Sequence, residues 1–120
     1  MKYLLLIHTN PANWALLPEE TRNGLMGEYL AFTKDIIGSG ELVDGAPLAD
    51  PSTATTVRVL DGATETTDGP FAESKEHLAG YYLIECESLD RAVELAARIP
   101  DARYSGVEVR SVMDMAGQEM

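Results

Sequence analysis

The sequence has little cysteine, little positive charge and no long apolar run. Cys86 is its one cysteine, so no internal disulfide can form, and we predict a reducing compartment, the cytoplasm. Nine Lys and Arg residues stand against 20 Asp and Glu residues, a net charge of −11. Such a surface disfavours nucleic acid and anionic membranes as partners. No stretch approaches the roughly 20 apolar residues of a membrane span.

Common catalytic signatures are also missing. The sequence contains no phosphate-binding or dinucleotide-binding glycine loop, and no Gly-x-Ser-x-Gly, Cys-x-x-Cys or His-Glu-x-x-His motif. We therefore predict no cofactor. We predict no metal either: His8, His77, Asp68 and Glu73 are suitable ligand types, but their spacing matches no metal-binding motif.

The 120 residues fit a single domain, residues 1–120. The apolar patterns and turn signals predict strands at residues 3–8, 41–46, 53–60, 64–67, 78–87 and 106–112, and helices at residues 18–38 and 89–99. Asp61 and Gly62 predict a tight hairpin turn, and Ser88 predicts a helix N-cap. Pro11 and Asn13 are interpreted as a break in the first strand. One helical turn is expected at residues 73–77, and a loose tail at residues 114–120.

This order of elements is typical of a ferredoxin-like α+β sandwich, a split βαβ arrangement, with an inserted hairpin. Both helices are expected to cover the same face of an antiparallel sheet. The strands at residues 3–8 and 78–86 are apolar on both faces, so the other face needs a cover of its own. A second copy of the chain is the simplest cover, and we predict a homodimer.

The segment at residues 67–83 has the most unusual composition. Its Asp-Gly-Pro-Phe run, residues 68–71, predicts a sharp reversal, and four ionisable residues lie within it or close by: Asp68, Glu73, Lys75 and Glu76. Loops held by rigid strands often carry functional sites. Two interpretations are open. In one, Asp68 serves a site; in the other, Asp68 only bonds turn amides while Phe71 covers the sheet edge.

The run Asp-Gly-Pro-Phe-Ala-Glu-Ser-Lys-Glu at residues 68–76, with Gly-Tyr-Tyr-Leu-Ile-Glu at residues 80–85, resembles the signature of DGPF-domain proteins of the YCII-related family. The similarity extends over nearly the whole chain. It implies a dimeric α+β barrel, in which two ferredoxin-like subunits pack face to face, with a pocket in each. Some relatives use a His on the first helix and an Asp near the end of the second. This chain has Tyr29 and Ile99 at those positions, which puts transfer of that mechanism in doubt.

A site built from other residues is also open. His8 ends the first predicted strand, and an imidazole near a carboxylate is an ordinary acid–base pair, so we predict His8 and Asp68 as catalytic residues. A surface histidine at a strand end is the alternative interpretation of His8. The predicted pocket residues are Trp14, Tyr29, Phe71, Lys75, Glu76 and Tyr82.

Two functions fit these patterns. The first is a cofactor-independent small-molecule enzyme of isomerase, lyase or hydrolase type that uses acid–base chemistry. The alternative is a non-catalytic module that binds a small ligand or serves regulation, because DGPF-type domains occur near or fused to extracytoplasmic-function sigma factors. The enzyme requires His8 and Asp68 within hydrogen-bond reach in a concave pocket, whereas a binding module requires only an apolar pocket.

Overall fold

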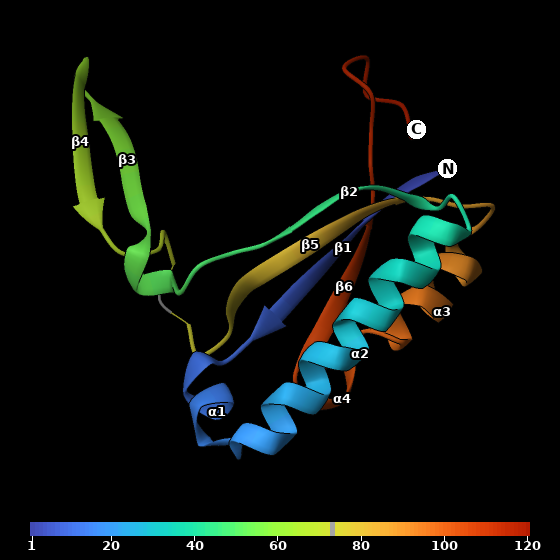
Figure 1. The fold of residues 1–120 in the computed structure, drawn as a ribbon. Helices are drawn as coiled ribbons and strands as arrows, with labels where there is room; N and C mark the ends of the chain where they lie inside the picture. Colours follow the sequence, from blue (N-terminus) through green and yellow to red (C-terminus); the bar gives the residue numbers. More distant parts are fainter. Residues whose placement is uncertain (73) are drawn as a thin grey trace.

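A computed structural model describes residues 1–72 and 74–120 of the protein. Its elements, labelled in Figure 1, are β1 (Lys2–Thr9), α1 (Pro11–Leu16), α2 (Glu19–Gly38), β2 (Leu42–Pro47), the 3-10 turn η1 (Pro51–Thr53), β3 (Thr55–Leu60), β4 (Ala63–Asp68), β5 (His77–Glu85), α3 (Leu89–Ala97), α4 (Asp101–Tyr104) and β6 (Gly106–Ser111).

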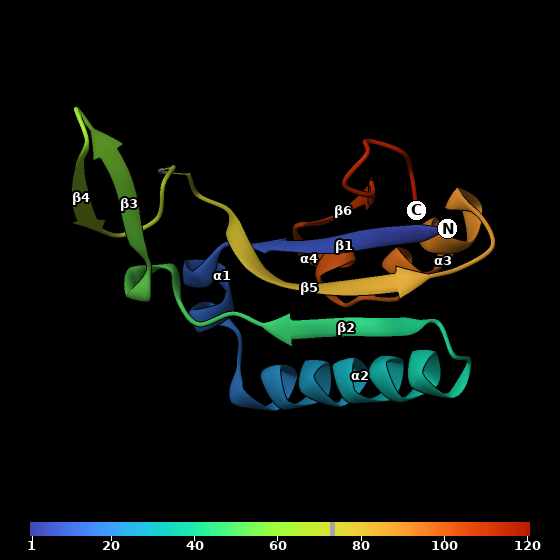
Figure 2. The same cartoon turned by 90° about the horizontal axis from the view of Figure 1, so that it is seen from above.

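Four strands form an antiparallel sheet in the order β2-β5-β1-β6, in which β1 and β5 are central. The helices α2 and α3 lie on the same side of this sheet (Figures 1 and 2). This arrangement confirms the predicted ferredoxin-like α+β fold. β3 and β4 pair only with each other and form a separate two-stranded sheet that stands away from the sandwich (Figure 1).

The core lies between the helices and the sheet. Successive strand residues point to opposite faces, so Tyr3, Leu5 and Ile7 of β1 are buried toward the helices. In α2 the buried residues recur at helical spacing, which turns one face of the helix to the sheet. The buried residues of this core are Tyr3, Leu5, Ile7, Phe32, Ile36, Ile84, Cys86, Ala92, Leu95, Ala96 and Ile99.

The helix ends show which local signals were interpreted correctly. Ser88 caps α3 as predicted, because its hydroxyl accepts a hydrogen bond from the Arg91 amide at 3.1 Å. Pro11 and Asn13 follow the end of the first strand as expected, because β1 ends at Thr9, but the helix α1 that begins at Pro11 was not predicted. The Asn10 side chain accepts from the Ala12 amide at 3.0 Å, and Pro11 occupies the first turn, so the same residues begin α1.

The hairpin turn forms as predicted, with Asp61 at φ 51° and Gly62 at φ 79°. Two successive positive φ values match the right-handed twist of the flanking strands, and this explains the Asp-Gly pair. The helical turn expected at residues 73–77 is absent from its described part: residues 74–76 are irregular, and His77 begins β5. Glu73 lies outside the described residues.

Residues 114–120, for which the sequence predicts a loose tail, turn back to the end of the sheet. The Lys2 amide donates to the Met120 carbonyl at 2.6 Å, and the Met120 amide donates to the Val112 carbonyl at 2.7 Å. Both chain ends therefore meet at one end of β1 (Figure 1). Among the helices of the described residues, none is long and apolar enough to cross a membrane.

Candidate functional site

A cavity of about 730 Å³ opens at the end of the sandwich where α1, α2, the end of β2 and the start of β5 meet. Most of its walls are apolar or aromatic. Among the residues that line it are Ile7, Trp14, Met26, Tyr29, Leu30, Thr33, Leu42, Leu48, Asp50, His77, Tyr82 and Asp101. A concave, mainly apolar space with a few polar groups is the usual form of a small-molecule site.

The strand geometry at this end shapes the cavity. Ile7 pairs with Gly80 and His8 pairs with Leu78, so Ala79 is an extra residue that forms a bulge in β5. A bulge bends its strand and often lies beside a functional site. The Leu48 amide donates to the Ala79 carbonyl at 2.8 Å and ties the chain after β2 to this bulge.

Gly80 keeps the strands β2 and β5 close at the cavity wall. A Cβ atom at Gly80 would lie 3.0 Å from the Ala46 carbonyl oxygen and 3.3 Å from Pro47 Cα. Both contacts are with backbone, which cannot move aside as a flexible side chain could. The glycine is therefore required by close packing and not by an unusual backbone angle.

Tyr82 and Thr33 form the polar contact at the centre of the cavity wall. The Tyr82 hydroxyl lies 2.7 Å from Thr33 Oγ1, and Thr33 Oγ1 donates its own proton to the Tyr29 carbonyl at 2.8 Å. Tyr82 is therefore the donor in the first contact, because a threonine hydroxyl has one proton. The ring of Tyr82 also packs edge-on against Phe32 at 5.3 Å. Its oxygen keeps only acceptor capacity for a ligand.

Asp101 reaches the cavity from the turn that follows α3. Ile99 and Pro100 are buried and anchor this turn, and an ion pair of Arg103 with Glu28, 2.8 Å between Nη2 and Oε2, holds α4 against α2. Burial raises the pKa of the Asp101 carboxyl above its ordinary value of 3.8, because a low-dielectric surrounding penalises the charged form.

Asp50 and His77 lie on the same cavity at its η1 side. The Ser52 amide donates to Asp50 Oδ1 at 2.9 Å. This hydrogen bond is the main reason that the pKa of Asp50 lies below its ordinary value of 3.8, and positive charge on His77 lowers it further. The two cavity carboxyls thus have pKa values shifted in opposite directions.

A smaller cavity of about 300 Å³ adjoins the first on the other side of α1. Thr9, Trp14, Tyr29 and Asp101 line both cavities. These four residues therefore lie between the two spaces, and Asp101 borders both.

The structure separates the residues that the sequence analysis grouped together. Trp14, Tyr29 and Tyr82 line the large cavity. His8 lies on the sheet face away from the helices, because it alternates with the buried residues of β1. Its Nε2 atom is 3.5 Å from Glu108 Oε1 and makes no hydrogen bond within the described part of the chain.

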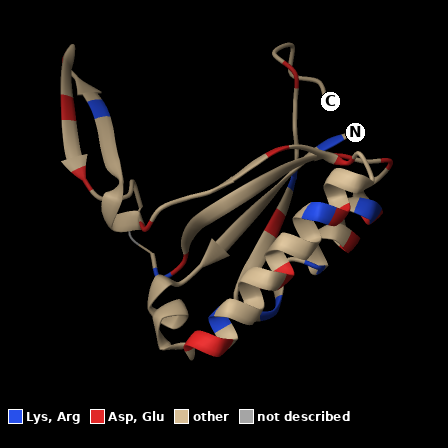
Figure 3. Cartoon of the chain, in the orientation of Figure 1, with Lys and Arg blue, Asp and Glu red and all other residues tan. Residues whose placement is uncertain are grey.

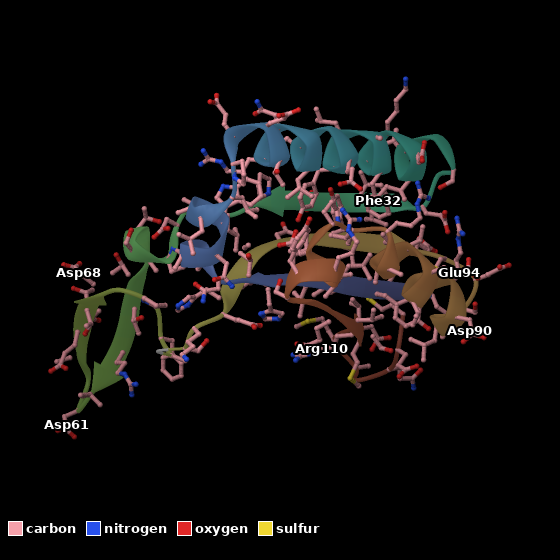
Figure 4. All side chains as sticks on the ribbon, turned by 90° about the horizontal axis from the view of Figure 1, so that it is seen from below. Phe32, Asp61, Asp68, Asp90, Glu94 and Arg110 are labelled. Atoms are coloured by element: carbon pink, nitrogen blue, oxygen red, sulfur yellow. The ribbon has the colours of Figure 1, made fainter. Side chains whose placement is uncertain are left out.

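Asp68, Phe71, Lys75 and Glu76 lie at or near the base of the hairpin and do not line either cavity. Asp68 pairs with Thr55 in the hairpin, at the opposite end of the molecule from most of the sandwich (Figure 4). No hydrogen bond or ion pair joins His8 to Asp68 among the described residues. Phe71 is 75% exposed, and the Arg58 guanidinium stacks over its ring at 5.0 Å.

The Asp-Gly-Pro-Phe turn has a visible structural role. Gly69 adopts φ 106°, a conformation that favours glycine. Its amide donates to the Ala54 carbonyl at 2.7 Å, and its carbonyl accepts from Thr56 Oγ1 at 2.8 Å. These two bonds fasten the end of β4 to the start of β3 and close the hairpin at its base.

Comparison with known proteins agrees with this fold. The model of the YCII-related domain matches residues 1–116. The chain belongs to the YCII-related family. An uncharacterized protein of Rhizobium meliloti (strain 1021) is 34% identical over 105 residues, which cover 88% of this chain and 85% of that protein.

For this YCII-related chain, the sequence analysis missed Asp50 and Asp101 and did not predict that His77 lies at the cavity, naming it only as a residue type suited to a metal site that was not predicted. Asp101 follows Pro100 directly, and an acidic residue after a helix-ending proline was the available signal. Asp50 resembles an ordinary cap before Pro51, which it also is. Within residues 1–72 and 74–120, no group of three His, Cys, Asp or Glu side chains could hold a metal ion.

Proposed function

We propose that this YCII-related protein is a cofactor-independent enzyme that transfers a proton on a small, mainly apolar molecule. Asp101 is its acid–base group. The observation that supports this proposal is a half-buried carboxyl on the wall of an apolar cavity, with a pKa that burial raises. A carboxyl whose pKa moves toward neutrality donates and accepts protons more effectively near pH 7.

The second cavity carboxyl supports the same assignment. Hydrogen bonding from Ser52 lowers the pKa of Asp50, whereas burial raises the pKa of Asp101. Two carboxyls with pKa values shifted apart are typical of acid–base sites. Tyr29, which lines both cavities, offers a hydroxyl for a developing oxyanion. His8 and Asp68 are not part of this proposal because neither lines the cavity.

The test follows proton transfer directly and needs no known product. The protein is incubated in deuterated water with a panel of small aromatic and alicyclic ketones, and exchange of their acidic C–H protons is followed by NMR. We expect exchange above the buffer rate for panel members that bind. Asp101→Asn is expected to lose this exchange, by about 100-fold or more for a general acid–base group, while still binding the ligand.

Asp61→Asn is the matched control, because it removes one carboxylate from the hairpin turn, and asparagine tolerates a positive φ. It is expected to keep full exchange. If panel members bind but exchange no proton, the alternative of a non-catalytic ligand-binding module replaces the enzyme. If Asp101→Asn exchanges as fast as the wild type, Asp101 is not the acid–base group.

We also propose that the protein is a cytoplasmic homodimer that packs through the sheet face away from α2 and α3. Alternation along the strands places Leu4, Leu6, Tyr81 and Leu83 on that face. The helices α2 and α3 lie on the opposite side of the sheet (Figures 1 and 2). A central apolar stripe of this kind is typical of a subunit interface.

Light scattering on a sizing column tests the dimer. The wild type is expected to elute with twice the mass of the chain at micromolar concentration. Leu83→Glu is expected to give monomers, because it places a charge in the proposed interface. Met115→Glu, at a fully exposed position in the C-terminal segment, is the control and should stay dimeric. A wild-type monomer would overturn the proposal.

A further inference from the structure

The large cavity has an unusual balance of charge. Of the described residues that line it, Asp50 and Asp101 can be negative, His77 is the one basic group, and none is Lys or Arg. The helix α1, which forms one wall, carries no charged residue (Figure 3). A carboxylate or phosphate ligand would meet two acidic groups and no permanent cation. The wall charge therefore disfavours anions and favours cations.

The aromatic side chains favour the same kind of ligand. Trp14, Tyr29 and Tyr82 line the cavity, from α1, α2 and β5. The faces of aromatic rings carry partial negative charge and attract an ammonium group within about 6 Å. The remaining apolar side chains, among them Leu30, suit a hydrocarbon or aryl body.

The hydrogen-bond direction at Tyr82 gives an independent indication. Its proton goes to Thr33 Oγ1, because the proton of Thr33 goes to the Tyr29 carbonyl. The free lone pair of the Tyr82 oxygen therefore accepts a hydrogen bond and does not donate one to a ligand. An N–H group satisfies this oxygen, whereas a carboxylate oxygen would be repelled by it.

Asp50 is suited to hold the charge of such a ligand. Its Oδ1 atom caps η1 by accepting from the Ser52 amide. Asp50 is exposed at the cavity mouth, so a ligand reaches it without a change in the fold. Asp101 lies on α4, a different element from the η1 turn that Asp50 caps. Binding of the ligand charge by Asp50 therefore does not use Asp101, which remains available for proton transfer.

We propose that the cavity selects small aromatic or alicyclic amines in their protonated form. The ammonium group binds Asp50, and the ring lies among Trp14, Tyr29 and Tyr82. This inference rests on the proposed function, because it assigns the substrate class of the same site. Proton transfer then takes place at a carbon or heteroatom of the ring end, within reach of Asp101.

Three probes of similar size and different charge test the proposal: 2-phenylethylamine, 2-phenylethanol and 3-phenylpropanoate. Binding to the intact protein is measured by titration calorimetry and by NMR at low and high salt. We expect the amine to bind about fivefold more tightly than the alcohol, the size expected for a partly exposed ion pair. The carboxylate is expected to bind most weakly, and added salt should reduce the preference for the amine.

Asp50→Asn is the decisive variant because asparagine caps a turn as well as aspartate does, so the fold is preserved. It is expected to remove the preference of the amine over the alcohol while the alcohol binds as before. Asp61→Asn, the control, should leave the preference unchanged. The proposal is overturned if the alcohol or the carboxylate binds as tightly as the amine, if Asp50→Asn keeps the preference, or if none of the three probes binds.

Failure of this inference is distinguishable from failure of the proposed function. Asp101→Asn is expected to keep the preference for the amine and lose proton exchange, whereas Asp50→Asn is expected to lose the preference. If proton exchange on the ketone panel depends on Asp101 while the amine shows no preference, the enzyme stands and only the substrate class is wrong.

Discussion

The sandwich and the β3–β4 hairpin are both antiparallel, yet they are stabilised by different means. In the sandwich, β1 alternates buried and half-buried residues against two helices. In the hairpin, every residue of β4 is exposed, as is every residue of β3 except Thr56. The hairpin is therefore held by its turn, by the pairing of β3 with β4 and by the two hydrogen bonds of Gly69. An isolated two-stranded hairpin is at best marginally stable in water.

The overall dimensions reflect the same difference. The radius of gyration is 16.4 Å, whereas a compact chain of this length is expected to have about 14 Å. The projecting hairpin accounts for part of the excess (Figure 1). In the hairpin, turn chemistry specifies a structure that core packing does not hold. The two regions are therefore expected to unfold separately.

The largest effect is expected for Ile84→Ala in the centre of the core. Ile84 has no exposed surface, so the change leaves a cavity and should lower the free energy of unfolding by about 2–5 kcal/mol. Urea denaturation followed by circular dichroism measures it. Ile37→Ala, at a position 61% exposed on α2, is the matched control and should change the free energy by less than about 1 kcal/mol. Equal losses would show that the core is misassigned.

A smaller loss is expected for Glu41→Gln, which breaks the ion pair between Glu41, the residue before β2, and Arg91 of α3. The Arg91 guanidinium donates to both carboxylate oxygens of Glu41, at 2.9 and 3.0 Å. This hydrogen bonding lowers the pKa of Glu41 below its ordinary value of 4.5. The pair therefore stabilises the fold above pH 4.5, and its contribution disappears as the pH falls through the lowered pKa.

Urea midpoints at pH 7 and pH 3 measure this dependence. The difference between the wild type and Glu41→Gln should be larger at pH 7 than at pH 3. Glu94→Gln removes the exposed partner of the same arginine and should cost little at either pH. A difference between wild type and Glu41→Gln that is the same at both pH values would contradict the assignment.

A small gain in stability is expected for Asp101→Asn. Burial raises the folded-state pKa of Asp101, so its stabilising contribution is present below pH 3.8 and is lost as the pH rises through the raised pKa. At pH 7 the ionised carboxylate therefore costs stability, and a neutral asparagine removes that cost. Thermal unfolding at pH 7 and pH 3 should show a higher midpoint for the variant only at pH 7. A loss of stability at pH 7 would indicate a structural role instead.

The smallest effect on global stability is expected for Gly62→Val in the hairpin turn. A β-branched residue is strained at φ 79°, although nothing lies within 4 Å of the site. Cross-strand NMR contacts between Val57 and Thr66 should be lost, while the urea midpoint of the sandwich stays the same. If the midpoint falls as far as in Ile84→Ala, the hairpin belongs to the same cooperative unit, as it would if a second subunit covered it.

Local signals in the sequence were sufficient for most of the architecture. Ser88 and the Asp61-Gly62 pair act on atoms a few residues away, so their effects could be predicted without the fold. The Asn10 cap is equally local, but Pro11 beside it was interpreted only as the end of the first strand, and the helix α1 that begins there was missed. Residues 74–76 are irregular, so the helical turn expected at residues 73–77 was wrong in its described part. Here the error was the opposite one, because a helical turn was predicted where none forms in residues 74–76.

The candidate site depends on contacts that no local pattern describes. Tyr82 forms a hydrogen bond with Thr33, which is 49 residues away in the sequence, and Arg103 forms one with Glu28, which is 75 residues away. The second contact sets α4 against α2 and so brings Asp101 to a cavity that β5 also lines. Strand alternation turns His8 to the other sheet face, where Glu108 is its neighbour.

The sequence by itself determined the family, the order of the six strands and the two long helices, and a tight turn at Asp-Gly-Pro-Phe. These features follow from side-chain periodicity and from backbone preferences, which act over a few residues. Only the tertiary structure decided that this turn closes a hairpin outside the cavity, and that Asp101 and Asp50 share one space with opposite shifts in pKa. Burial and the identity of neighbours set those shifts, and both arise only when distant segments pack together.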